Sequence, residues 1–210
     1  MSNIPKKNLV IIEGPTGAGK STYIDNVFQC NRSTLTVDSN FQQISKGRFT
    51  FDECAHEEAI KNDKLKLTKA FNFLSLDDTD TVLIDRLFFS DLVYEHIRNY
   101  GRSVKSSSWL QVSQPISLLE RFADFIIQQS REVEFYQDFQ IELVLICPEN
   151  YQLLADRRKK NPSKAYPFAC LDWYLYNQII LAINKYVGRR NTRVSAIYRI
   201  NNILLTLINE

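Results

Sequence analysis

A glycine-rich segment near the N-terminus has the residue types and spacing of a phosphate-binding loop. Two glycines enclose four residues and precede a lysine and hydroxyl side chains, in the run Gly14-Pro15-Thr16-Gly17-Ala18-Gly19-Lys20-Ser21-Thr22. Glycines let backbone N–H groups converge on a polyphosphate without interference from Cβ atoms. Lys20 can then reach the outer phosphates, and the Ser21 hydroxyl can ligate Mg²⁺.

This chemistry needs a strand before the loop and a helix after it. Residues 8–13 form a short apolar run that predicts a buried strand, and residues 21–28 have the pattern of a helix. The start of a helix adds partial positive charge where the phosphates would bind. A glycine-rich turn that binds nothing is the alternative, and the flanking elements favour phosphate binding over it.

A second pair of candidate residues is Asp85 and Arg86, which follow the apolar run 81–84. The run predicts a strand, so both residues would stand at its carboxyl end, beside the loop. A carboxylate there is suited to a Mg²⁺ site, and Arg86 would bring a permanent positive charge into the same cleft. In the alternative reading, Asp85 only caps the following helix and Arg86 lies on a solvated face.

The third feature is a run of cations, Arg157-Arg158-Lys159-Lys160, continued at Lys164. It follows a predicted strand at 141–146, and Pro162 interrupts it. Charge runs are usually solvated faces. A basic lid at about 156–167 that closes over bound phosphates is the interpretation we favour, because cations recur around transferring phosphoryl groups.

The order of elements predicts an α/β fold with a five-stranded parallel sheet and helices on both faces. Strands are expected at 8–13, 34–37, 81–84, 141–146 and 193–200. Helices are expected at 21–28, 52–74, 87–100, 115–138, 149–158 and 168–187, with a terminal helix from 201 onward. Ligands bind at the carboxyl edge of such sheets, where Glu13, Asp38, Asp85 and Cys147 should gather.

The composition is that of one ordinary globular domain over residues 1–210. The chain is 44% hydrophobic and 24% charged, with a net charge of +2, so no general attraction to nucleic acid or membrane is implied. Its four cysteines form no Cys-x-x-Cys pair, which favours reduced thiols and a cytoplasmic location. No long apolar run follows the N-terminus, so neither a signal peptide nor a membrane anchor is expected.

Together these segments resemble the thymidylate kinase and deoxynucleoside kinase group of phosphate-loop enzymes. The resemblance rests on residues 12–22, on residues 84–94 with an Asp-Arg pair and Ser90 four residues after the Arg, and on the basic lid. It implies a nucleoside or nucleotide kinase architecture that uses ATP and Mg²⁺. Lys20 would hold the donor phosphates, Ser21 and Asp85 the metal, and Arg86 the acceptor. Arg157 and Arg158 would clamp the transferring phosphoryl group.

The acceptor is the open part of this interpretation. Residues 37–43 match neither the Arg-Glu-Pro-Gly-Gly-like turn of thymidylate kinases nor the Glu-Pro-Val-like turn of nucleoside kinases. A hydroxyl acceptor would benefit from a general base, for which Asp38 is the candidate, whereas a monophosphate needs only cations. The cations outweigh the single Asp38, so a thymidylate-kinase-like transfer to a (deoxy)nucleoside monophosphate is favoured.

Two alternatives remain. The chain could be a deoxynucleoside kinase, or could phosphorylate a hydroxymethylated pyrimidine in DNA, with Arg98, Arg102 and Lys105 following the DNA backbone. It could also be a nucleotide-binding switch or an ATPase module. A switch GTPase should carry an Asn-Lys-x-Asp-like motif, and residues 147–150 read Cys-Pro-Glu-Asn instead. The absence of this motif favours a kinase, whose expected partner is a small-molecule nucleoside or nucleotide acceptor. The chain could also form a homodimer.

Overall fold

The computed structural model describes residues 7–30, 34–37, 53–87, 115–160, 169–186, 196–200 and 203–209. Its strands are β1 (Lys7–Glu13), β2 (Thr34–Val37), β3 (Thr81–Asp85), β4 (Phe139–Cys147), β5 (Ala196–Ile200) and β6 (Ile203–Asn209). Its helices are α1 (Lys20–Cys30), α3 (Glu53–Leu74), α5 (Pro115–Glu132), α6 (Tyr151–Lys159) and α7 (Ala169–Tyr186). None of these helices is both long enough and apolar enough to cross a membrane.

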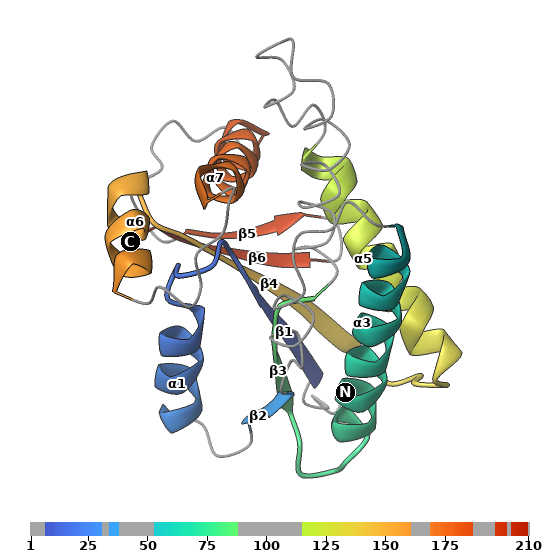
Figure 1. The fold of residues 1–210 in the computed structure, drawn as a ribbon. Coiled ribbons are helices and arrows are strands. Elements are labelled where there is room, and N and C mark those ends of the chain that lie inside the picture. Colours follow the sequence, from blue (N-terminus) through green and yellow to red (C-terminus); the bar gives the residue numbers. More distant parts are fainter. Residues whose placement is uncertain are drawn as a thin grey trace.

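The strands form one twisted sheet in the order β2-β3-β1-β4-β6-β5 (Figure 1). The neighbours from β2 to β6 pair in parallel, and β5 pairs antiparallel with β6. Strand β1 therefore lies between β3 and β4, with Ile12 opposite Asp85 of β3 and Val144 of β4. The loop that follows β1 leaves the sheet where the carboxyl ends of all three strands meet.

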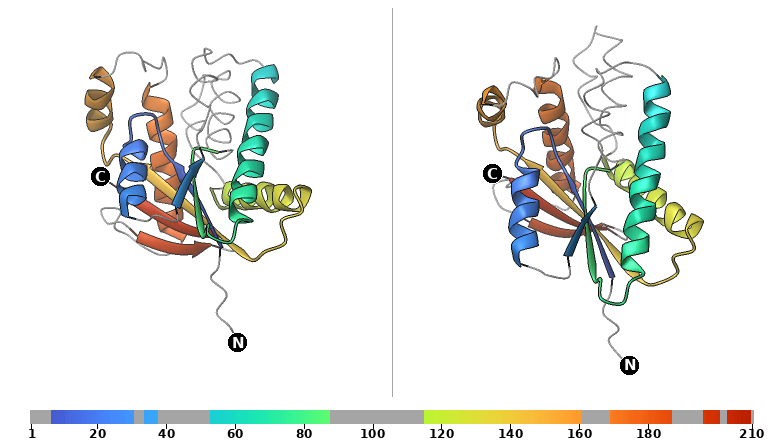
Figure 2. Two further views of the ribbon diagram at one scale, coloured as in Figure 1. Left: turned by 90° about the horizontal axis from the view of Figure 1, so that it is seen from below. Right: turned by 60° about the horizontal axis from the view of Figure 1, so that its bottom comes forward.

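Helices cover both faces of the sheet, as the sequence predicts (Figures 1 and 2). Alternate residues of β1 point to opposite faces, which is the period of a strand. Leu9 and Ile11 pack with α3, α5 and α7 in the larger core. Val10 and Ile12 pack with Ala18 and Ile24 in a smaller core under α1. The order strand, glycine-rich loop, helix at the N-terminus is confirmed.

The C-terminal prediction is wrong in type and in number. Residues 203–209 form a parallel strand rather than a helix, and the sheet has six strands in the described part of the chain rather than five. The strand predicted at 193–200, observed as β5, pairs antiparallel with β6, so the sheet is mixed rather than wholly parallel. The run Ile203-Leu204-Leu205-Thr206-Leu207-Ile208 is short and apolar except for Thr206, so its periodicity does not separate a buried strand from a helix. Its neighbours on both sides, β4 and β5, explain why polar residues are so few.

The predicted end of the helix at 115–138 also needed correction. Helix α5 ends at Glu132, earlier than the predicted 138, because Glu134 takes a left-handed φ of 57°. The N–H of Phe135 then donates to the carbonyl of Ser130 and closes the helix end. In α3, Phe73 is 37% exposed, whereas Phe71 and Leu74 are buried. The predicted helix 87–100 lies outside the described residues beyond Leu87.

Candidate active site at the carboxyl edge of the sheet

The glycines of the phosphate loop are required by its backbone. Gly14, Gly17 and Gly19 have φ values of 148°, 87° and 101°, which side-chain-bearing residues rarely adopt. A Cβ atom at Gly14 would overlap the carbonyl oxygen of Ile146 in β4. A Cβ at Gly17 would lie 3.3 Å from Leu154 in α6. The loop is thus held close against β4 at its start and against α6 at its middle.

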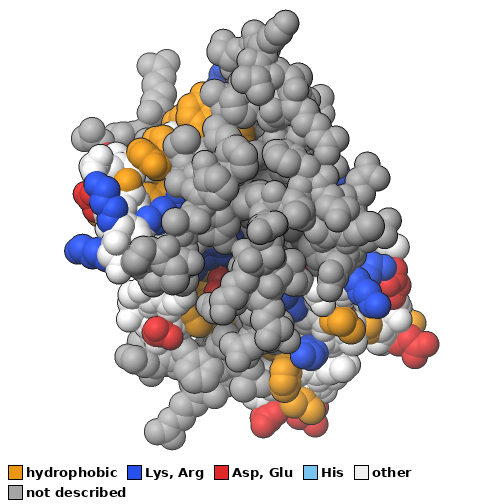
Figure 3. Space-filling view, in the orientation of Figure 1, with side chains coloured by type: hydrophobic (Ala, Val, Ile, Leu, Met, Phe, Trp, Pro, Cys, Tyr) orange, Lys and Arg blue, Asp and Glu red, His pale blue; other side chains and the backbone are white. Residues whose placement is uncertain are grey.

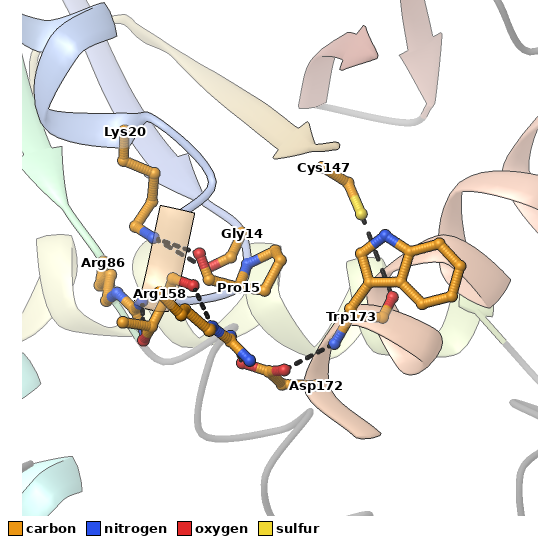
Figure 4. A network of polar contacts seen from close by, with 9 residues as sticks. Gly14, Pro15, Lys20, Arg86, Cys147, Arg158, Asp172 and Trp173 are labelled. Carbon is orange, nitrogen blue, oxygen red and sulfur yellow. Dashed lines mark hydrogen bonds and ion pairs between the residues drawn. The ribbon is translucent and has the colours of Figure 1, made fainter. Parts of the chain in front are cut away.

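Lys20 turns back over the loop that precedes it. Its Nζ donates to the carbonyl oxygens of Gly14 at 3.0 Å and Pro15 at 2.9 Å, and the side chain is buried (Figure 4). The pKa of Lys20 is lowered from 10.5 to about 7, chiefly by burial and then by the charge of nearby Arg86, whereas the carboxylates of Asp85 and Glu13 oppose this shift. A bound polyphosphate would favour the charged form of this lysine.

Arg86 comes from the next strand and reaches the same loop. Its guanidinium Nη2 donates to the hydroxyl of Thr16 at 2.8 Å. Its backbone N–H donates to the carbonyl of Ile12 at 3.0 Å, and its φ is 67°. The sequence placed Arg86 near the loop, and the structure brings the two together. The contact with Thr16 was not predicted, because nothing in the local sequence indicates the left-handed turn.

Asp85 and Ser21 are the residues proposed for Mg²⁺, and their surroundings fit that role. Asp85 ends β3, and its Oδ1 is buried with no hydrogen-bond partner in the described part of the chain. Ser21 and Thr22 begin α1 with exposed side chains. No cluster of three or more His, Cys, Asp or Glu side chains able to hold a metal occurs among the described residues. A Mg²⁺ ion here would therefore take most of its ligands from phosphate oxygens and water, as Mg²⁺ usually does.

The described part of the predicted lid is helical rather than a loop. Arg157, Arg158 and Lys159 form the last turn of α6, where cations are favoured by the helix dipole. The helix begins at Asn150, whose side chain accepts the N–H of Leu153 at 2.9 Å. The helical pattern extends one residue beyond the predicted end at 158. Residues 161–168 lie outside the described part of the chain.

Both arginines of α6 contact the phosphate loop. Arg157 Nη1 donates to the carbonyl of Ala18 at 3.2 Å, and Arg158 Nε donates to the carbonyl of Thr16 at 2.8 Å. Arg158 also forms a 2.7 Å ion pair with Asp172 of α7, and both side chains are buried (Figure 4). Burial raises the pKa of Asp172, an effect that Arg158 opposes. Thr16 therefore accepts hydrogen bonds from two arginines. Arg86 donates to its hydroxyl, and Arg158 donates to its carbonyl.

Sequence reasoning missed three parts of this site. It placed Glu13 at the sheet edge but gave it no role, although the fully buried carboxylate accepts the N–H of Leu87 at 2.7 Å and the hydroxyl of Tyr176 at 3.2 Å. It also missed Asp172 and the buried pair of Asp63 and Lys66 in α3. The available signal was an acidic residue near the start of the otherwise apolar helix α7.

The acceptor side of the predicted site lies outside the described residues. Asp38, the candidate general base, directly follows β2 but is not described, and the same holds for Arg98, Arg102 and Lys105. Figure 3 shows Lys and Arg side chains over α6 and, on the opposite side of the view, near α3 and α5, with acidic side chains beside both groups. The described side chains on this face form mixed-charge groups rather than one basic stripe.

Known proteins with a similar sequence or fold provide little information about the function of this site. No protein-family model matches the chain, and no curated protein matches its sequence. One solved structure that is similar is a deoxyadenosine kinase from M. mycoides with the products dCMP and a flexible dCDP bound. The match has a TM-score of 0.49 and 13% identity, and covers 95% of this chain and 88% of that chain. A similarity this weak assigns no function, which must come from the site itself.

Proposed function

We propose that this chain is a phosphotransferase that moves the γ-phosphoryl group of ATP to a nucleoside monophosphate, with Mg²⁺. The observation that carries the proposal is the convergence of Lys20, Arg86 and Arg158 on one glycine-rich loop at the carboxyl edge of the sheet. Phosphoryl transfer requires little covalent chemistry from a protein, and positioned cations with backbone N–H groups supply most of the catalysis.

Each residue of the candidate site has a defined role in the proposed reaction. Lys20 binds the β- and γ-phosphates, and residues 14–22 surround them. Arg86 and Arg158 stabilise negative charge that builds on the transferring group, and Arg157 holds α6 against the loop. Ser21 and Asp85 would hold Mg²⁺, which would offset the negative charge of the phosphates.

A monophosphate acceptor is supported by the contacts that already engage the described carboxylates at this edge of the sheet. A hydroxyl acceptor benefits from a carboxylate that takes its proton. Glu13 already accepts from Leu87 and Tyr176, and Asp172 accepts from Arg158 and Trp173. Asp85 is assigned to the metal. Asp38, which lies outside the described residues, is the candidate base that the sequence predicts, so the acceptor class can be tested at that residue.

The test is an assay of the purified chain with MgATP and a panel of acceptors. The panel contains nucleosides, nucleoside monophosphates, DNA with hydroxymethylated pyrimidines, and no acceptor. We expect a phosphorylated product from a monophosphate, none from Lys20→Ala, and little change in turnover for Asp38→Asn. Product from nucleosides or DNA alone, with a turnover loss of about 10²-fold or more in Asp38→Asn, would make the acceptor a hydroxyl. ATP hydrolysis without any transferred phosphate would instead support an ATPase or a switch.

A further inference from the structure

Arg86 has a backbone conformation that a residue with a side chain adopts only when its surroundings enforce it. Its φ of 67° lies in the left-handed region. Bulky residues hold this conformation only where neighbouring contacts fix it, and such positions concentrate at functional sites. This turn directs the guanidinium to Thr16 in the phosphate loop. The groups that hold the turn therefore also set where the Arg86 charge lies.

Three consecutive backbone groups around Arg86 have fixed partners. The N–H of Arg86 donates to the carbonyl of Ile12 at 3.0 Å. Its carbonyl accepts Nζ of Lys66 at 3.3 Å, and the next N–H, of Leu87, donates to Glu13 at 2.7 Å. The first of these bonds is backbone to backbone and does not depend on side chains. The other two depend on Lys66 and Glu13, which come from different elements.

Lys66 is unusual because it is a lysine whose side chain is buried. It lies in α3 with 6% of its surface exposed, paired at 2.9 Å with Asp63, which is fully buried. Taking two charges out of water is costly, and a buried ion pair seldom stabilises a fold more than apolar residues of the same size would. The pair does, however, supply a charged donor to the Arg86 carbonyl. Glu13 is likewise fully buried, and Tyr176 holds its second oxygen.

We propose that Lys66 and Glu13 are positioning residues that together hold Arg86 in its left-handed turn and so aim its guanidinium at the phosphate loop. Asp63 orients Lys66 through their ion pair, and Tyr176 orients Glu13. Neither Lys66 nor Glu13 needs to touch the nucleotide for this role. The kinetic part of the inference rests on the proposed phosphotransferase function, whereas its structural part does not.

Amide hydrogen exchange, measured residue by residue by NMR, tests the structural part. The double variant Asp63→Asn/Lys66→Met removes both buried charges together, which avoids leaving one uncompensated. We expect exchange at the amides of Arg86 and Leu87 to become at least about tenfold faster, with protection at Leu9 and Ile11 unchanged, because only local opening is affected. Lys64→Met is the matched control, since Lys64 is exposed on the same helix and pairs with Glu132.

Glu13 is tested in the same way with two substitutions. Glu13→Gln keeps an acceptor for the Leu87 N–H, so protection there should persist, whereas Glu13→Leu removes the acceptor and should expose it. If Glu13→Leu does not fold, Glu13→Gln and the α3 double variant still decide the question. Unchanged protection of Arg86 and Leu87 in the α3 double variant would overturn the inference.

A kinetic cycle then tests whether Lys66 acts through Arg86. We expect the α3 double variant to lower kcat at least about tenfold in the natural chain and to cause no further loss in an Arg86→Ala background. An equal loss in both backgrounds would mean that Lys66 acts independently of Arg86, against the inference. If the natural chain transfers no phosphate to any acceptor, the proposed function fails, and the exchange experiment alone decides the positioning role.

Discussion

Arg158 of α6 and Asp172 of α7 form a buried ion pair at 2.7 Å, and the same guanidinium donates to the carbonyl of Thr16. One arginine thus joins two helices to the phosphate loop. We expect Arg158→Met to lower the free energy of unfolding by about 3 kcal/mol, because it leaves Asp172 buried without its partner. Urea unfolding measures this. Lys159→Met is the control, since its pair with Asp156 is exposed and should change stability by less than about 0.5 kcal/mol.

The stability of Arg158→Met should also depend on pH. Burial already raises the folded-state pKa of Asp172 above that of the unfolded chain, and loss of Arg158 removes an opposing influence. A raised carboxyl pKa contributes stability at low pH that is lost as pH rises through the folded-state value. The gap between Arg158→Met and the natural chain should therefore be wider at about pH 8 than at about pH 5. An equal gap at both values would show that loss of Arg158 does not raise the pKa of Asp172 further, as expected if the carboxylate becomes solvated in the variant.

The buried Lys20 should make the fold more stable at alkaline pH. Its pKa is lowered from 10.5 to about 7, so the folded state binds fewer protons than the unfolded chain between these two values. Stability contributed by this group must then rise with pH across that window. We expect Lys20→Met to be more stable than the natural chain near pH 7, with the difference shrinking toward alkaline pH. Denaturant unfolding over a pH series measures both trends.

Nucleotide binding should be accompanied by proton uptake. A bound polyphosphate favours charged Lys20, so above about pH 7 binding should take up nearly one proton and weaken as pH rises. Calorimetric titration of ATP in buffers of different ionisation enthalpy counts the protons. Lys20→Arg is the matched control, because arginine stays charged and should take up none. Equal proton uptake in both proteins would place the titrating group elsewhere.

Asp85 and Arg86 should each be needed for turnover. We expect Asp85→Asn and Arg86→Ala to lower kcat by about 10²-fold or more, a loss typical of a positioned electrostatic group. Steady-state kinetics with the acceptor found in the panel measure this, and circular dichroism checks the fold. Asp78→Asn, an exposed carboxylate in the turn before β3, is the control. Near-normal turnover in both site variants would leave Asp85 as a helix cap and place the reaction elsewhere.

The sequence was sufficient for the features that local pattern controls. The strand before Gly14, the helix after Lys20 and the position of Asp85 at a strand end follow from apolar runs and glycine spacing. Residues 203–209 could not be assigned correctly, because a short, mostly apolar run fits a buried strand and a helix equally well. Only its position between two other strands decides the matter.

The contacts within the site were much less predictable than its location. Arg158 contacts Thr16 and Asp172, and Glu13 contacts Leu87 and Tyr176, from segments far apart in the chain. A single sequence gives the types of these residues but not which of them meet. Arg86 illustrates the limit further, since its left-handed turn is imposed by partners in other elements rather than by its own residue type.

Both edges of the sheet end in short strands, of four residues in β2 and five in β5. The apolar strand β6 lies inside, with β4 on one side and β5 on the other. A segment such as 203–209, rich in isoleucine and leucine and free of charge, is a template for intermolecular strand pairing when its backbone is exposed. The antiparallel strand β5 therefore protects the protein from self-association, and any change that detaches it should appear first as aggregation.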